Sequence, residues 1–162
     1  MNWVNSHYLK EADNQWLAEQ VQQRIINRDG DPQAVDLPEA MGLLKDRSET
    51  LEQLADAAML FCGPAAKPAA ELVDKHITDE AKAAIVDFWA QAGSTDWSSA
   101  ELGALLKSIL KSHSLKMPHF AIPLRLIVAG NPQTPAIDAV LALMGRDRVG
   151  ERLRAFGLDC PA

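Results

Sequence analysis

The chain has 162 residues, of which 48% are hydrophobic and only 6% aromatic, and its formal net charge at pH 7 is −6. This composition is typical of an all-α protein, and no apolar run approaches the ~20 residues of a membrane span. No signal peptide opens the chain, and two distant cysteines, Cys62 and Cys160, cannot form a disulfide framework. These features predict a cytoplasmic protein of one or two small helical domains.

The charge is unevenly distributed along the chain. Residues 1–106 carry 8 basic and 18 acidic side chains, whereas residues 107–162 carry 8 basic and 4 acidic ones. A basic patch within an acidic protein is the form that an RNA-facing surface takes. A solvated helix face that bears arginines explains the same asymmetry, so the charge leaves both interpretations open.

The first half of the chain predicts a small helical bundle. Residues 2–11 form one short expected helix, Asp13 suits the N-cap of a second, Asp36 begins a third, and Ser48 suits the N-cap of a fourth. Apolar residues recur at 3- and 4-residue steps in these helices and predict the core: Trp16, Leu17, Val21, Ile25, Met41, Leu44, Leu51, Leu54, Ala58 and Phe61.

The middle of the chain contains the predicted subdomain boundary. Residues 63–68 are the clearest loop, and a helix capped by Thr78 is expected over 79–91. A small polar segment then separates a first helical subdomain, residues 1–94, from a second, residues 95–162. The second opens with the sequence SSAE at residues 98–101, a capping box in which a serine serves the third amide.

The last stretch predicts three short helices. Pro118 suits the first turn of one helix, which contains Pro123 and ends at Gly130. Thr134 before a proline is expected to be the N-cap of the next helix, and Asp147 that of the last. Helices this short must pack together to persist, and their arginines are expected to stay on the surface: Arg125, Arg146, Arg148, Arg152 and Arg154.

The sequence contains no recognisable catalytic constellation. A G-x-S-x-G elbow, an H-E-x-x-H pair, a C-x-x-C pair and a glycine-rich phosphate loop are all absent, and the four histidines lie in separate segments. Recognition remains as the expected role. Single-stranded RNA loops are bound by hydrogen bonds to splayed bases, and arginine suits this task because its planar fork donates two bonds to one base edge.

Three ordered segments resemble a known family. The strings IPLRLIVAG and TPAIDAVLALMGRDRVGERL are similar to the end of bacterial-type glutamyl-tRNA synthetases, where PLR, TG, a TPG-like turn and ALLGKERVLERL follow in that order. NWVNSHYLKE near the start and LLKDRSETLEQLADAAMLF in the middle resemble the same family. Together the matches span nearly the whole chain, which therefore resembles the C-terminal anticodon-binding region of such an enzyme without its catalytic domain.

This resemblance implies a class I anticodon-binding helical domain made of two small helical bundles. The implied partners are the anticodon loop of tRNA-Glu and the catalytic domain of the same polypeptide, joined through residues 1–11, with a monomeric state and no membrane. ATP and Mg would belong to the catalytic domain, and no cofactor, metal or catalytic residue is expected in this chain. HIGH-like and KMSKS-like signatures are absent, so the chain alone is expected not to activate an amino acid.

The resemblance also implies RNA-binding roles for five residues. Arg47 matches the arginine that distinguishes C from G at the third anticodon base, and Arg125 matches one near the first base. Thr134 and Ile137 match positions that flank the splayed bases, where helical N-terminal amides would also favour a phosphate. Trp3 matches a tryptophan at the joint with the preceding domain, near the RNA.

Simpler interpretations stand beside each of these roles. Arg47 could act on its helix end electrostatically, Arg125 could be a surface charge, Thr134 could be only an N-cap, and Trp3 could belong to a core. The chain also has Ala136 where the family usually has glycine, and its methyl group is expected to narrow the approach of a base or backbone near Thr134 and Ile137. The alternative for the whole chain is a helical protein-docking module with no RNA role.

Overall fold

The structure is a computed structural model that describes residues 11–63 and 67–160. Every regular element in these residues is a helix, which confirms the all-α prediction. The chain divides into two compact units, residues 1–64 and residues 65–162. The helix expected over residues 2–11 lies almost wholly outside the described residues.

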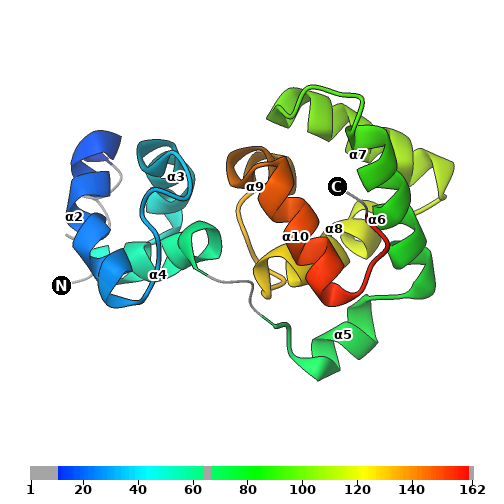
Figure 1. Cartoon of the computed structure of the whole chain (residues 1–162), viewed down its shortest axis with the longest axis horizontal. Coiled ribbons are helices and arrows are strands. Elements are labelled where there is room, and N and C mark those ends of the chain that lie inside the picture. Colours follow the sequence, from blue (N-terminus) through cyan, green and yellow to red (C-terminus); the bar gives the residue numbers. More distant parts are fainter. Residues whose placement is uncertain (1–10, 64–66, 161–162) are drawn as a thin grey trace. The chain divides into compact units, whose positions relative to one another are not determined.

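The described residues of the first unit form three α-helices and one short turn of 3₁₀-helix, drawn in blue to cyan-green in Figure 1. These are α2 (Asn14–Asn27), α3 (Leu37–Leu44), η1 (Lys45–Arg47) and α4 (Leu51–Cys62). Helix α2 packs against both α3 and α4. Their buried residues confirm most of the predicted core, namely Leu17, Val21, Ile25, Met41, Leu44, Leu54, Ala58 and Phe61, whereas Trp16 and Leu51 are only partly buried.

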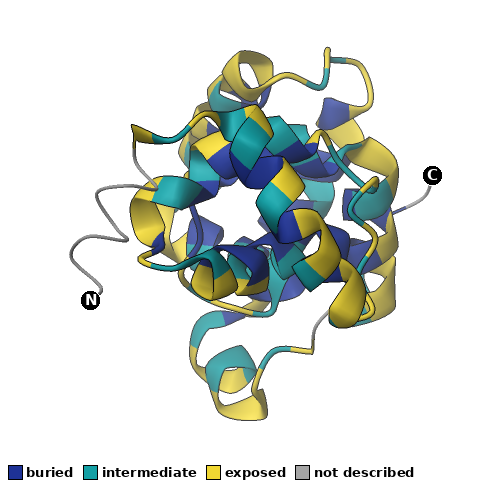
Figure 2. Cartoon of the chain, turned by 90° about the vertical axis from the view of Figure 1, so that its left-hand side faces the viewer, coloured by how far each residue is buried: buried dark blue, intermediate teal, exposed yellow. Residues whose placement is uncertain are grey.

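The second unit contains the remaining helices, drawn from green to red in Figure 1. They are α5 (Ala70–His76), α6 (Asp79–Ala92), α7 (Ser99–Ser112), α8 (Met117–Ala129), α9 (Ile137–Met144) and α10 (Arg146–Phe156). Helix α8 packs against α5, α6 and α10, and α7 packs against α6 and α9. Figure 2 shows buried and exposed positions on opposite sides of the same helices, as amphipathic helices require.

The two compact units divide at Pro64 rather than at the expected 94/95 boundary. The reason is that α6 packs against α7 and α8 and shares their core, while α5 packs against α8. In that core the rings of Phe88 and Phe120 meet edge to face with centroids 6.0 Å apart. The polar segment near residue 95 is therefore a turn within one bundle and not a linker between two.

Most predicted helix ends are confirmed. The side chains of Asp13, Asp36, Thr78 and Ser98 each accept a backbone hydrogen bond in the first turn of their helices. Gly130 ends α8 with φ 71°, in the left-handed region where glycine avoids the steric cost of a Cβ atom.

Two other predicted N-caps, Ser48 and Asp147, are wrong. Helix α4 is capped by Thr50, because η1 continues the preceding helix and leaves Ser48 buried with its hydroxyl bonded to the Leu44 carbonyl. Helix α10 starts at Arg146 after Gly145, which places Asp147 inside its first turn. There the carboxylate still complements the positive helix end.

Helix α5 is absent from the sequence-based prediction. Its seven residues include no buried side chain, and Leu72 and Val73 are only partly covered. About two helical turns that include only Leu72 and Val73 as large apolar residues show no helical periodicity in the sequence, so the packing of α5 against α8 supplies the stabilisation that the local pattern lacks.

An ionic cluster joins α2 to α4 in the first unit. Arg24 Nε lies 2.6 Å from Glu52 Oε1, while Arg28 reaches Glu52 Oε2 at 2.7 Å and Asp56 Oδ1 at 2.6 Å. The hydrogen bonds from Arg28 and then Arg24 hold the pKa of Glu52 below its ordinary value. Two arginines of this unit are therefore committed to carboxylates of α4.

We expect Glu52→Gln to reduce the acid sensitivity of the first unit. A carboxylate with a lowered pKa binds its proton more weakly in the folded than in the unfolded chain. Its stabilisation is thus complete above the ordinary glutamate pKa and is lost as the pH falls through the lowered value. Thermal unfolding followed from pH 7 to about 3 should show a flatter acid limb in this variant than in the parent.

The matched control for this experiment is Glu19→Gln, an exposed carboxylate of α2 that forms no ion pair with a described residue. It should leave the acid limb as steep as in the parent chain. Equal flattening by both substitutions would contradict a specific role for the ionic cluster.

Candidate nucleic-acid interface

Arg47 is the last residue of η1 and is exposed to solvent. Its backbone is held by its neighbours, because Leu44 is buried on one side and the buried Ser48 hydroxyl bonds back to the Leu44 carbonyl. Lys45, at the other end of η1, donates to the Ala12 carbonyl at 3.2 Å.

The Arg47 guanidinium differs from those of the other two arginines in the first unit. Arg24 and Arg28 are bound to carboxylates of α4, whereas no described residue accepts a hydrogen bond from the Arg47 side chain or forms an ion pair with it. The end of η1 thus presents a donor group whose hydrogen-bonding capacity is unused by the described part of the chain.

Arg125 and Thr134 are brought together in the second unit. Arg125 lies in α8, one turn before its end, and its Nε donates to Thr134 Oγ1 at 3.0 Å. The Thr134 hydroxyl in turn donates to the Pro135 carbonyl at 2.8 Å, and the side chain is buried. The bond crosses the turn between α8 and α9 and fixes the orientation of the half-buried Arg125.

Thr134 is not the N-cap of α9, contrary to the prediction. The helix begins at Ile137, and Ala136 occupies the N-cap without a side-chain hydrogen bond. The physical reason is that the threonine hydroxyl is already engaged by Arg125 and Pro135.

Ile137, a predicted base-flanking residue, is 5% exposed and belongs mainly to the core. Asp138 follows it, and its carboxylate accepts a hydrogen bond from the Ala139 amide at 2.9 Å. An acidic side chain therefore occupies part of the helix end that was expected to favour a phosphate. Trp3, the remaining predicted residue, lies outside the described residues.

The prediction that all arginines of the last stretch stay outside is wrong for Arg152. Its side chain is 4% exposed and donates to the Val128 carbonyl near the end of α8. Burial, with a smaller contribution from Arg148, lowers the pKa of Arg152 to about 10, so it remains protonated at neutral pH. The signal was present in the sequence, because Arg152 falls in the same i, i+3, i+4 stripe as Val149 and Leu153.

Two further arginines are engaged within the second unit. Arg146 is exposed and its guanidinium carbon lies 5.0 Å from the centre of the Trp89 ring, a cation–π contact. Arg154 Nη1 donates to the Cys160 carbonyl at 2.8 Å. These contacts hold α10 against α6 and against the segment around Cys160.

Comparison with known proteins identifies the family. The model of the family described as "Anticodon binding domain" matches residues 9–156. The chain belongs to the anticodon-binding domain family.

Curated relatives of this anticodon-binding domain carry the name glutamate–tRNA ligase. The protein from Bordetella petrii is 54% identical over 156 residues, which cover 96% of this chain and 33% of that protein. The protein from Azoarcus sp. is 46% identical over 154 residues, covering 94% of this chain and 33% of the relative. The chain thus spans about one third of the length of the curated relatives that it matches.

Solved structures agree with the fold. The glutamate tRNA ligase of Elizabethkingia meningosepticum superposes on 95% of this anticodon-binding domain with a TM-score of 0.82, at 15% sequence identity, and the match covers 31% of that chain. At this low identity the likeness concerns the fold alone.

The two units of the anticodon-binding domain differ in net charge. Residues 1–64 carry 5 basic and 11 acidic side chains, and residues 65–162 carry 11 of each. Arg47 therefore stands in an acidic unit and Arg125 in a neutral one. Within the described residues, His, Cys, Asp and Glu side chains form no group of three suited to a metal ion, and no helix combines the length and apolar character needed to span a bilayer.

We expect Thr134→Val to loosen the turn between α8 and α9. The substitution keeps the shape of a buried side chain but removes the acceptor for Arg125 Nε, and loss of a hydrogen bond to a charged group costs about 1–3 kcal/mol. Amide hydrogen exchange of α8 and α9 should report a correspondingly lower free energy of opening. Thr134→Ser, which retains the hydroxyl, should stay close to the parent, and equal losses in the two variants would contradict a role for the hydrogen bond.

Proposed function

We propose that the chain is the anticodon-binding part of a glutamate–tRNA ligase and that it binds the anticodon loop of tRNA-Glu. The observation that carries this proposal is the 54% identity to such a ligase over 96% of the chain. The catalytic domain of the same polypeptide, with its ATP and Mg, is the proposed partner in cis. The proposed setting is the cytoplasm, and the proposed state is a monomer.

The third anticodon base is assigned to Arg47. Cytosine presents O2 and N3 acceptors on its pairing edge to a side chain that only donates, whereas guanine is larger and presents N–H donors there. The exposed Arg47 guanidinium, with no described intramolecular partner, supports this assignment. The result would be preference for a glutamate anticodon ending in C over a glutamine anticodon ending in G.

The first anticodon base is assigned to the region of Arg125. The hydrogen bond that Arg125 donates to Thr134 pre-orients this arginine, which supports a role in which little side-chain freedom remains to be lost on binding. Thr134 and Ile137 then act by shaping the turn beside the bases, since both side chains are buried. Trp3 is the proposed RNA contact near the joint with the catalytic domain. At Ala136 the methyl group leaves less room for an approaching base than glycine would.

The direct test is binding of the chain to two anticodon hairpins that differ only in C or G at the third anticodon position. Arg47→Gln should weaken binding of the C hairpin by about 1–3 kcal/mol and reduce the preference between the two. The affinity of the parent should also fall steeply with salt. The same substitution in the longer ligase should narrow the gap between charging of glutamate and glutamine tRNAs.

The matched control is Arg24→Gln, which removes another arginine of the same unit but one bound to Glu52. It should leave the preference between hairpins unchanged once both variants are shown to be folded. An unaltered preference in Arg47→Gln, or equal effects of the two substitutions, would contradict the assignment of Arg47.

A further inference from the structure

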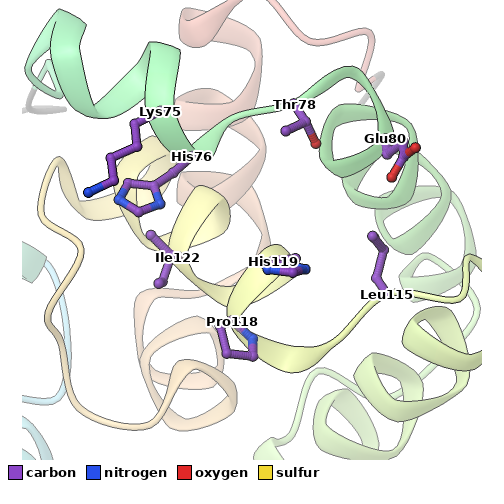
Figure 3. A pocket seen from close by; sticks show the side chains of 8 residues that line it. All are labelled: Lys75, His76, Thr78, Glu80, Leu115, Pro118, His119 and Ile122. Atoms are coloured by element: carbon purple, nitrogen blue, oxygen red, sulfur yellow. The ribbon is translucent and has the colours of Figure 1, made fainter.

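A second candidate site lies in the hollow between α5, the start of α6 and the start of α8. It encloses about 410 Å³ and is lined by residues of these helices and of the segment before α8 (Figure 3). Small-molecule sites of proteins usually enclose about 300–1,000 Å³. None of the residues assigned above to the anticodon contributes to this hollow.

The lining has an apolar centre and polar groups of opposite charge at its two sides. Leu115, Pro118 and Ile122 supply the apolar surface. In Figure 3, Lys75 and His76 lie on one side of His119, and Glu80 lies on the other. The hollow therefore has a cationic side at the end of α5 and an anionic side at the start of α6.

Thr78, one polar lining residue, accepts a hydrogen bond from the Ala81 amide as the N-cap of α6, but four other polar side chains of the hollow are not used within the described part of the protein. No described residue forms a hydrogen bond or ion pair with the side chains of Lys75, His76, Glu80 or His119. This contrasts with α2 and α4, where Arg28 and Glu52 satisfy each other. Unused donors on one side and an unused acceptor on the other, around one apolar centre, indicate a particular kind of ligand. It would be negatively charged at the end that faces Lys75 and would donate a hydrogen bond at the end that faces Glu80.

We propose that this hollow binds a single nucleotide whose base carries an exocyclic amine, cytosine or adenine. The phosphate would lie at Lys75 and His76, where an ammonium donates charge-assisted hydrogen bonds. The base would stack on His119 over the apolar residues, as unpaired bases stack on histidine in RNA-binding sites. Glu80 would accept from the amine, whereas the O4 acceptor of uracil would face the carboxylate unfavourably.

The test is a titration of the folded chain, followed by amide NMR signals, with CMP, UMP, cytidine and inorganic phosphate at millimolar concentrations. CMP should shift signals of residues 75–80 and 115–122, and it should bind at least about fivefold more tightly than UMP or phosphate. Glu80→Gln should abolish the preference for CMP over UMP. No shift at the lining residues, or equal binding of CMP and phosphate, would overturn the proposal.

Charge variants on the surface provide the matched pair. Lys75→Glu should weaken CMP binding about tenfold, and Lys107→Glu, the same charge change at an exposed position of α7 outside the hollow, should not. Equal effects of the two would also overturn the proposal. Both side chains are exposed, so the variants should retain the parent's helical content and unfolding temperature.

Binding of a short single-stranded RNA distinguishes two sources of the nucleotide, an unpaired residue of RNA and a free nucleotide. Tighter binding of a CCC trinucleotide than of CMP identifies an unpaired nucleotide of RNA as the ligand, and the reverse order identifies a free nucleotide. This site does not depend on the anticodon assignment, because Arg47→Gln should leave CMP binding intact. Failure of CMP to bind while hairpin binding remains Arg47-dependent would remove this proposal alone.

Discussion

The buried guanidinium of Arg152 is the constraint on which the second unit depends. A charge removed from water is tolerated only when hydrogen bonds satisfy it, and here the carbonyl of Val128 at the end of α8 accepts one. The C-terminal carbonyls of a helix have no partner within the helix. The bond therefore satisfies both the Arg152 guanidinium and the Val128 carbonyl. It ties α10 to the last turn of α8.

The turn that presents the proposed RNA contacts starts at that same point. Gly130 reverses the chain with a left-handed conformation directly after α8, and the turn then returns Thr134 to within hydrogen-bond distance of Arg125. Fixing the end of α8 thus fixes both ends of the Arg125–Thr134 hydrogen bond. The orientation of Arg125 is a consequence of core packing and not of a surface loop.

The two arginines proposed to contact anticodon bases differ in the side-chain entropy that they would lose on binding. Arg125 is oriented before RNA arrives and has less rotamer freedom to lose. Arg47 ends a 3₁₀ turn and is exposed, so RNA binding by Arg47 must overcome a loss of side-chain entropy of up to about 2 kcal/mol. An exposed donor with no described partner suits discrimination between cytosine and guanine, since its hydrogen bonds form only when the matching acceptors are present.

Local chemistry explains which structural features were predictable. The caps at Asp13, Asp36, Thr78 and Ser98 and the left-handed Gly130 depend on a residue and its nearest neighbours, and they were predicted correctly. The apolar stripes of α2 and α4 have a period that a helix alone can satisfy.

Features set by tertiary contacts could not be predicted in the same way. Thr134 precedes a proline and so looks like a cap in the sequence, whereas its actual partner, Arg125, lies nine positions earlier in the preceding helix. Helix α5 has no apolar stripe of its own, and the division after residue 64 follows from the packing of α5 on α8 and of α6 on α7 and α8. The candidate RNA contacts rest on family resemblance alone and stay a prediction, because an arginine that reads a base and one that merely faces solvent are identical in sequence.

The central claim is that one anticodon is contacted by residues of both compact units. The most direct measurement uses an anticodon hairpin with a nitroxide label in its loop, bound to the chain, and follows paramagnetic broadening of amide signals. The account predicts strong broadening at residues 45–50 and at residues 130–137 in the same complex. Broadening confined to one of these segments, or found only elsewhere in the chain, would contradict it.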